Sequence, residues 1–419
     1  MLQVQFDVKL MKVLQDMIVR LRDGEIAPSI QADYEMYFKD VADVQQLLML
    51  HELVSSYYDI TITDVQRFFV AQDHLYNKEH KTSDSLQYDI VGHPVRIFIE
   101  ENNAFQQLLQ KIRHTLTMIE QQEQVNPHDV LTIQEDIFHL GEFHKHYHRK
   151  EKLLFPIFER YGQHTPTRLM WRLDDRIRAL YQGAKRQIDQ LPNIELTNVQ
   201  KMYDTFEKEF LDMIYREEKL ILPVLIATFS EEDWQAIANE SEAFSYALIG
   251  DVDEWERTED IAVNQSLEEE LFSEMKDKDL PFGGGYLSIE EANLILNNLP
   301  LEITFVDKNS IFKYFNTITE ASDMMLVRTP TSIGRNVADC HPPISLKKVM
   351  TLVRDLKTKK RLSESMWIKK QGKYVHITYK GLFNDEDEFV GILEYVQNIQ
   401  PFFDLPTEVK TALSEVHDE

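Results

Sequence analysis

Apolar residues recur at steps of three and four positions from the start of the chain to about residue 245, with few glycines between them. This spacing is typical of amphipathic helices. The periodic runs are short over residues 1–80, whereas residues 88–248 have room for four longer helices, which predicts an antiparallel bundle. One tract in this half, residues 80–94, has the composition of a long connection. The first part of the chain is therefore expected to be all-α, with a small helical domain (1–80) before a four-helix bundle (88–248).

The pattern changes after residue 288. "LEITFVDKNSIFKYFN" predicts two short strands around a turn, and "SMWIKKQGKYVHITYKGLFNDEDEFVGILEYVQNI" predicts three more, with a mostly helical stretch between the two groups. Together they predict an antiparallel α+β domain over residues 288–403, in which the helical crossover covers one face of the sheet and leaves a cavity. Residues 249–287 are acidic, poor in aliphatics and end in three glycines, which indicates a linker, and residues 404–419 form a tail.

Composition narrows the class of protein. The chain has 419 residues, 43% of them apolar, so it can bury the cores of two or three domains. Its 45 basic and 71 acidic residues give a net charge of −26, which repels nucleic acid and anionic lipid. The single cysteine excludes an intramolecular disulfide, no apolar run is long enough for a membrane span, and the N-terminus lacks the pattern of a secretory leader. We expect a cytoplasmic protein that binds neither nucleic acid nor membrane.

Acidic residues fall on the apolar stripes of the predicted bundle. Glu101, Asp174 and Glu217 each lie among the apolar positions of a different helix. In the stretch "FHKHYHRKEKLLFP" a stripe includes His144 and Glu151, but a second apolar stripe includes His146, so periodicity alone leaves open which histidine points inward.

Carboxylates in a bundle core cost several kcal/mol each when they are left unpaired. One interpretation is a pair of divalent cations held by carboxylates and one or more histidines from facing helices. The other is that basic side chains of the bundle, namely Arg149, Lys150, Arg176 and Arg216, supply the countercharge.

Four motifs of the bundle carry a resemblance to a known family: "GHPVRIFIEENNAF", "FHKHYHRKEKLLFPIFERYG", "LMWRLDDRIR" and "MIYREEKLILPVL". In this order and spacing they resemble the four helices of a hemerythrin-like, HHE cation-binding domain, in the branch that has an extra N-terminal helical domain of unknown function. The resemblance implies a four-helix bundle with a metal site in its core.

The resemblance also implies which positions would bind the metal. The first-helix histidine of the family falls on Asn102, the second-helix histidine on His146 and the following glutamate on Lys150, with Glu151 adjacent. The third-helix histidine falls on Asp174, the fourth-helix histidine on Met213, and the carboxylate after it on Glu217. The candidate metal ligands are therefore His146, Glu151, Asp174 and Glu217, with Glu101 and His93 as additions. This carboxylate-rich set favours iron, manganese or zinc in an altered site over an oxygen carrier, and a site decayed into a salt-bridged core is the alternative.

The C-terminal region resembles a PAS sensor domain. The "IGR" after the helical stretch, the closing three-strand meander and the last strand "GILEYVQNI" carry the resemblance. Such domains hold haem, flavin, small metabolites or nothing, so the ligand is unknown. Cys340 and His341 in "ADCHPPISLKKV" are candidate haem ligands, although the same residues are also compatible with an ordinary helix start.

These features favour a cytoplasmic sensor or regulator, in which a variant hemerythrin-like metal site, or its remnant, is coupled to a PAS domain. No P-loop, "GxSxG", kinase or DNA-binding module accompanies the PAS region, so signalling through a protein partner, with a homodimer as the expected assembly, is favoured over enzymatic activity. The alternatives are a metal-dependent protein for iron–sulfur repair or small oxidants, and a haem-binding PAS sensor.

Overall fold

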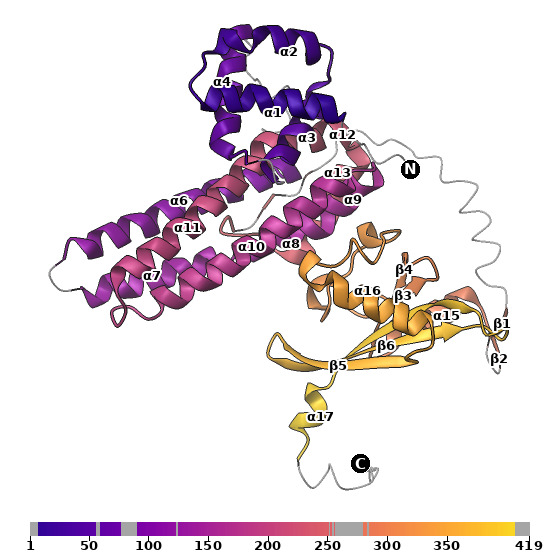
Figure 1. Cartoon of the computed structure of the whole chain (residues 1–419). Coiled ribbons are helices and arrows are strands. Elements are labelled where there is room, and N and C mark those ends of the chain that lie inside the picture. The colour runs from indigo at the N-terminus through magenta and orange to yellow at the C-terminus, as the bar shows by residue number, and fades with distance from the viewer. Residues whose placement is uncertain are drawn as a thin grey trace. The chain divides into compact units, whose positions relative to one another are not determined.

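The computed structural model describes residues 7–55, 59–76, 90–122, 125–250, 252–253, 255, 280–282 and 285–406. The chain divides into two compact units, Met1–Arg257 and Thr258–Glu419 (Figure 1). The first is helical and the second contains the strands, as the sequence predicts. Most of the expected 80–94 connection, most of the expected linker and nearly all of the tail lie outside the described residues.

The residues that the structure describes before the bundle form α1 (Val8–Arg22), α2 (Gln31–Tyr37), α3 (Asp43–Ser55) and α4 (Ile62–Tyr76). Asp7 caps α1 by accepting a hydrogen bond from the backbone N–H of Lys9 at 2.7 Å. Apolar side chains of these helices form a core of their own. Helix α3 also faces the bundle, because its Leu48 belongs to the bundle core while Leu220 of the bundle belongs to the N-terminal core. The N-terminal helices and the bundle therefore form one compact unit.

The bundle has the four long helices that the sequence predicts, and Figure 1 shows them side by side. The first is α6 (Pro94–Glu120), and the third is α10 (His164–Ile188). The second is built from α7 (Pro127–Leu140), α8 (Phe143–Arg149), a π-helical turn η2 (Lys150–Leu154) and α9 (Phe155–Arg160). The fourth is built from α11 (Leu196–Tyr215), a π-helical turn η3 (Arg216–Ile221) and α12 (Leu222–Thr228), and α13 (Glu231–Ser241) follows it.

The two π-helical turns change which side chains point into the core of the bundle. A π turn places an extra residue in the helix and rotates the side chains that follow it. In η2 the neighbouring residues Lys150 and Glu151 are both buried, and each is 2% exposed. In η3 the neighbouring residues Arg216 and Glu217 are also both buried, with 8% and 4% exposed. A regular amphipathic helix buries one stripe, so these turns add charged groups to the interior.

The C-terminal unit holds a five-stranded antiparallel sheet in the order β4-β3-β7-β6-β5. Its strands are β3 (Glu302–Asp307), β4 (Phe312–Phe315), β5 (Ser363–Lys370), β6 (Lys373–Phe383) and β7 (Phe389–Asn398). Helix α15 (Ile289–Asn298) precedes the sheet, α16 (Pro343–Lys357) lies between β4 and β5, and α17 (Gln400–Asp404) follows β7. Val306, Leu356 of α16 and Ile392 are among the buried residues of its core. The two strands, helical middle and three strands of the prediction are confirmed.

The end of the expected linker contains structure that its composition does not predict. Strand β1 (Leu280–Phe282) pairs with β2 (Gly285–Leu287) as a small hairpin, with Phe282 opposite Gly285. The composition predicts that the three glycines end a flexible linker, but the last of them begins a strand.

Among the described residues, no helix is both long enough and apolar enough to cross a bilayer.

Candidate functional site

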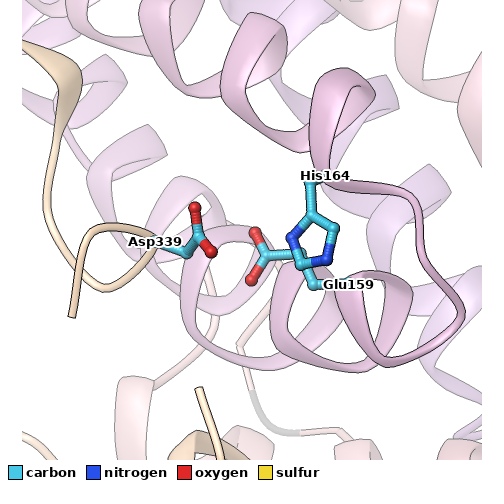
Figure 2. A group of neighbouring side chains, drawn as sticks. All are labelled: Glu159, His164 and Asp339. Carbon is cyan, nitrogen blue, oxygen red and sulfur yellow. The ribbon is translucent and has the colours of Figure 1, made fainter. Parts of the chain in front are cut away.

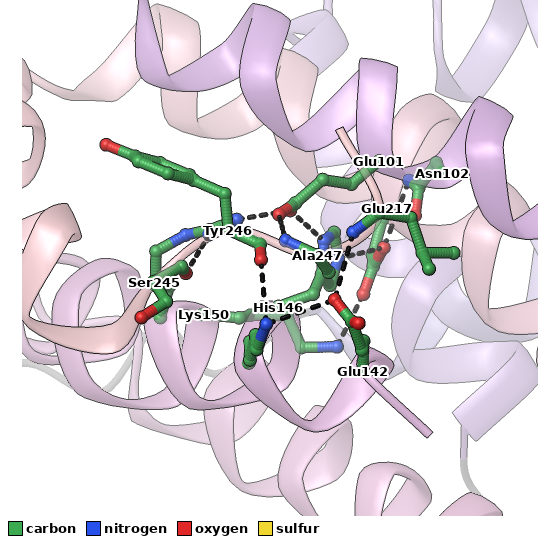
Figure 3. A network of polar contacts seen from close by, with 12 residues as sticks. Glu101, Asn102, Glu142, His146, Lys150, Glu217, Ser245, Tyr246 and Ala247 are labelled. Atoms are coloured by element: carbon green, nitrogen blue, oxygen red, sulfur yellow. Dashed lines mark hydrogen bonds and ion pairs between the residues drawn. The ribbon is translucent and has the colours of Figure 1, made fainter. Parts of the chain in front are cut away.

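Charged and polar side chains from all four bundle helices meet in the core. Figure 3 shows those from α6, α8, η2 and η3. Each is at most 4% exposed to solvent. We call them the inner cluster: Glu101 and Asn102 of α6, His146 and Arg149 of α8, Lys150 of η2, Asp174 of α10, and Glu217 of η3. Of the six residues proposed as metal ligands, the structure therefore brings together Glu101, His146, Asp174 and Glu217.

His146 bridges two carboxylates. Its Nδ1 lies 2.7 Å from Oε2 of Glu101, and its Nε2 lies 3.1 Å from Oε2 of Glu217. An ionised carboxylate only accepts hydrogen bonds, so both ring nitrogens donate and the ring is an imidazolium. Burial alone would lower the pKa of His146, but the Glu217 and Glu101 carboxylates outweigh it and the pKa is raised. His146, and not His144, is thus the histidine that points into the core.

Lys150 lies between the third and fourth helices. Its Nζ donates to Oδ1 of Asp174 at 2.7 Å and to Oε1 of Glu217 at 2.5 Å, and it lies 3.9 Å from the centre of the Tyr147 ring. Burial disfavours the ammonium, but the two carboxylates outweigh burial and raise the pKa of Lys150. The side chain is therefore a buried cation with two anionic partners.

Arg149 and Glu101 connect the inner cluster to the segment after α13. Arg149 Nη2 pairs with Oε2 of Glu101, and Nη1 donates to the carbonyl of Ser245 at 2.6 Å. Oε1 of Glu101 accepts the backbone N–H of Ala247 at 2.6 Å. The Arg149 guanidinium also lies 4.8 Å from the centre of the Tyr246 ring. Three consecutive residues of this segment are thus held by the cluster.

The acids of the cluster differ in their ionisation. Burial would raise the pKa of Glu217, but the charges of Lys150 and His146 outweigh burial and lower the pKa to about 2. Asn102 Nδ2 adds a hydrogen bond to Oε2 of Glu217 at 3.2 Å. For Asp174, burial raises the pKa well above its ordinary value despite the attraction of Lys150, and its Oδ2 has no hydrogen-bond partner among the described residues. Glu217 is thus firmly ionised, whereas Asp174 accepts a proton more readily.

The donor set can be compared with what a divalent cation needs. A metal ligand must offer a lone pair, but both nitrogens of His146 donate to carboxylates, and both oxygens of Glu101 and of Glu217 already accept bonds from protein donors. Among the described oxygens of the inner cluster's carboxylates, Oδ2 of Asp174 alone has no donor. In this arrangement the residues do not fit a divalent metal ion.

Two further candidate ligands lie outside the inner cluster. Glu151 is buried, but its Oε1 lies 2.7 Å from Nη1 of Arg178, a countercharge that is not among the four basic residues proposed from the sequence. His93 caps α6 by accepting from the N–H of Val95 at 3.2 Å, and its ring packs against Trp234 and Trp255. Burial lowers the pKa of His93 to about 4, consistent with a neutral capping residue.

Only two of the four proposed countercharges act in the core. Arg149 pairs with Glu101, and Lys150 pairs with Asp174 and Glu217. Arg176 pairs with Glu209 at 2.8 Å with 59% of its side chain exposed, and Arg216 donates to the carbonyl of Val54 at 3.0 Å. Arg216 therefore helps to hold α3 on the bundle, a contact between segments that no local pattern indicates.

A pair of possible ligand groups lies where the second helix ends and the third begins (Figure 2). Glu159 near the end of α9 and His164 at the start of α10 have potential ligand atoms within 4.8 Å of each other. Oε1 of Glu159 already accepts the hydroxyl of Thr167 at 2.8 Å, which ties the turn together. Asp339 is also drawn in Figure 2, but it belongs to the C-terminal unit, and we do not treat it as part of one site with Glu159 and His164.

In the C-terminal unit, Cys340 and His341 lie directly before α16, whose first residue is Pro343. Both are partly buried, and Nδ1 of His341 lies 2.9 Å from the carbonyl of Val337. A cavity of about 370 Å³ is lined elsewhere, by Phe315, Met324 and Arg328 among others. The proposed haem ligands are not among the described residues that line this cavity.

Comparisons with known proteins find a family match within each unit. The bundle matches the hemerythrin HHE cation binding domain over residues 93–225, and the C-terminal unit matches a PAS domain over residues 292–400. No curated protein matches the chain.

Several solved structures are similar to parts of it. A C-terminal domain from Streptococcus mutans is 48% identical, covers 31% of this chain and 99% of that chain, and has a TM-score of 0.31. A sensory box sensor histidine kinase from Vibrio cholerae is 11% identical, with 26% and 88% covered and a TM-score of 0.20. The Vibrio cholerae VqmA dimer is 18% identical, with 29% and 55% covered and a TM-score of 0.23.

Proposed function

We propose that this chain, which joins a hemerythrin HHE domain to a C-terminal PAS domain, is a cytoplasmic sensory or regulatory protein in which the core of the bundle is coupled to the PAS domain. The bundle contributes a charged remnant of the family's cation site, and the PAS domain contributes a ligand cavity. Its output is contact with a protein partner, and the assembly is a homodimer.

The observation that carries this proposal is the attachment of the inner cluster to residues 245–247. This segment comes after α13 in the chain and before the PAS domain. It is held by the hydrogen bonds from Arg149 to the Ser245 carbonyl and from the Ala247 N–H to Glu101, each 2.6 Å long. Because both bonds end on buried charges, a change in the cluster alters the conformation of the segment directly.

The backbone of this segment is suited to change. Ser245 and Leu248 have φ values of 61° and 64°, in the left-handed region that non-glycine residues rarely adopt. Such conformations cost of the order of 1–3 kcal/mol each and persist where surrounding contacts impose them. Loss of the bonds to Arg149 and Glu101 therefore releases the segment to a relaxed conformation.

The PAS unit has a polar group of residues that suits a small ligand. Arg328 lines the cavity of about 370 Å³, and it pairs with Glu302 at 2.9 Å and lies 3.6 Å from Glu394. Because this buried arginine belongs to the lining of the cavity, it favours a small polar ligand over a purely apolar one.

The test compares the full chain with Arg149→Met. Hydrogen exchange measured by mass spectrometry follows two sets of peptides, one over residues 242–250 and one over β5 to β7. We expect faster exchange in both sets, because the released segment transmits the change to the PAS domain. Arg176→Met is the matched control, since it removes an exposed arginine of the same bundle.

Faster exchange in residues 242–250 with no change in the PAS peptides would show that the two domains are not coupled and would refute the proposal. The alternative of metal-dependent iron–sulfur repair or oxidant handling requires iron, manganese or zinc in the bundle, which elemental analysis detects. A haem-binding PAS domain would show a Soret absorption band in the purified chain that Cys340→Ala or His341→Ala abolishes.

A further inference from the structure

The ammonium of Lys150 bridges carboxylates of two bundle helices, as a metal ion bound between them would. It contacts a carboxylate from α10 and a carboxylate from η3, at 2.7 Å and 2.5 Å, and it is 2% exposed. Metal sites in helical bundles are built in the same way, from carboxylates that project inward on facing helices around a central positive charge. In this chain the positive charge belongs to a side chain.

We propose that Lys150 is the resident cation of this HHE domain, and that the bundle core therefore binds no divalent metal. The matched family is described as cation binding. In this chain the cation is covalently part of the second helix, and it occupies the sequence position where the resemblance places a glutamate ligand. One substitution would thus both remove a ligand and supply the charge that the metal would have supplied.

The charge of the inner cluster supports this exchange. Its three acids, Glu101, Asp174 and Glu217, face three bases, His146, Arg149 and Lys150. With every acid ionised the cluster is neutral, and with Asp174 protonated it has one positive charge in excess. A divalent cation would add two uncompensated positive charges to a buried site, and this is strongly unfavourable.

The same count predicts the consequence of replacing Lys150. Lys150→Met leaves one negative charge in excess, and Lys150→Glu leaves two, which is the charge that a divalent cation neutralises. Lys150→Glu also frees Oδ1 of Asp174 and Oε1 of Glu217 from their ammonium donor and adds a third carboxylate beside them. Oxygen ligands of this kind suit manganese and iron, and the histidine suits iron or zinc.

The test uses the full chain, expressed with manganese, iron or zinc supplied in turn. Elemental analysis after dialysis should find under about a tenth of an equivalent per wild-type chain, and the melting temperature should not change with EDTA. Lys150→Glu should retain an equivalent or more of metal and melt at a lower temperature with EDTA. Lys208→Glu is the matched control, because it makes the same charge change at a side chain of α11 that is 66% exposed.

The wild-type protein decides the proposal by itself. If it retains an equivalent of metal after dialysis, or melts at a lower temperature with EDTA, the proposal is wrong. A folded Lys150→Glu variant that gains no metal in any medium also contradicts the proposal, and if this variant does not fold, the two wild-type measurements still decide it. The coupling test is independent, since it measures exchange rates and not metal content.

Discussion

Removal of the Lys150 charge is the most direct perturbation of the inner cluster. In Lys150→Met the apolar stem is retained while the ammonium is lost, and Asp174 and Glu217 remain buried without it. Breaking a buried ion pair by removing one partner costs about 3–5 kcal/mol of unfolding free energy. Because the pKa of Asp174 is already raised, that group takes up a proton when the ammonium is lost, which places the cost near the lower end, about 3 kcal/mol.

A second variant separates the ion pair from general packing. Lys150→Met combined with Asp174→Leu removes one positive and one negative charge, so the remaining cluster is again balanced. Replacing a buried pair with apolar groups of similar volume is often neutral or stabilising. We therefore expect the double variant to regain most of the loss and to lie within about 1 kcal/mol of the wild type.

The assay must report the helical unit alone, because a chain with two compact units need not unfold in one step. Hydrogen exchange of peptides from α6 and α11 at increasing urea concentrations gives the unfolding free energy of this unit. Lys208→Met, which removes an exposed partner of Asp212, is the control and should cost less than about 1 kcal/mol. A loss in Lys150→Met no larger than in the control, or a double variant as unstable as the sum of its single variants, would contradict this reasoning.

Three further outcomes are expected. Burial lowers the pKa of His51 from 6.5 to about 3, so His51 takes up a proton in the unfolded chain before it does so in the folded chain as the pH falls below 6.5. Between pH 7 and pH 5 this residue should therefore lower the unfolding free energy by about 2 kcal/mol. In His51→Phe the decrease in unfolding free energy over this pH range should be smaller by the same amount. Gly391→Ala should destabilise the PAS unit by about 1–3 kcal/mol in thermal unfolding, because the new Cβ would meet the Val306 carbonyl and the Phe305 ring. Gly285→Ala should have no such effect, because a Cβ at that position would meet nothing within 4 Å beyond its chain neighbours. A fragment of residues 286–419 should melt cooperatively by circular dichroism, since the five-stranded sheet does not include β1, and a molten fragment would show this expectation to be wrong.

The sequence by itself determined the two kinds of domain and their order. Helical periodicity and strand alternation are local properties, and each element buries one face, so the pattern of apolar positions indicates both the element and its inner side. For the same reason the apolar pattern alone places Glu101, Asp174 and Glu217 on inward stripes. It does not predict the hairpin before α15, because three consecutive glycines have the composition of a flexible linker as well as that of a turn.

Only the tertiary structure decided what those carboxylates contact. Periodicity could not choose between His144 and His146, and it could not anticipate that a π-helical turn buries both Lys150 and Glu151. The partners of a buried charge come from other helices and, in the case of Ala247, from an irregular segment 146 positions away from Glu101. Ion pairs at such sequence separations depend on how the helices dock, and docking is set by the packing of whole faces, which no single stretch of sequence contains.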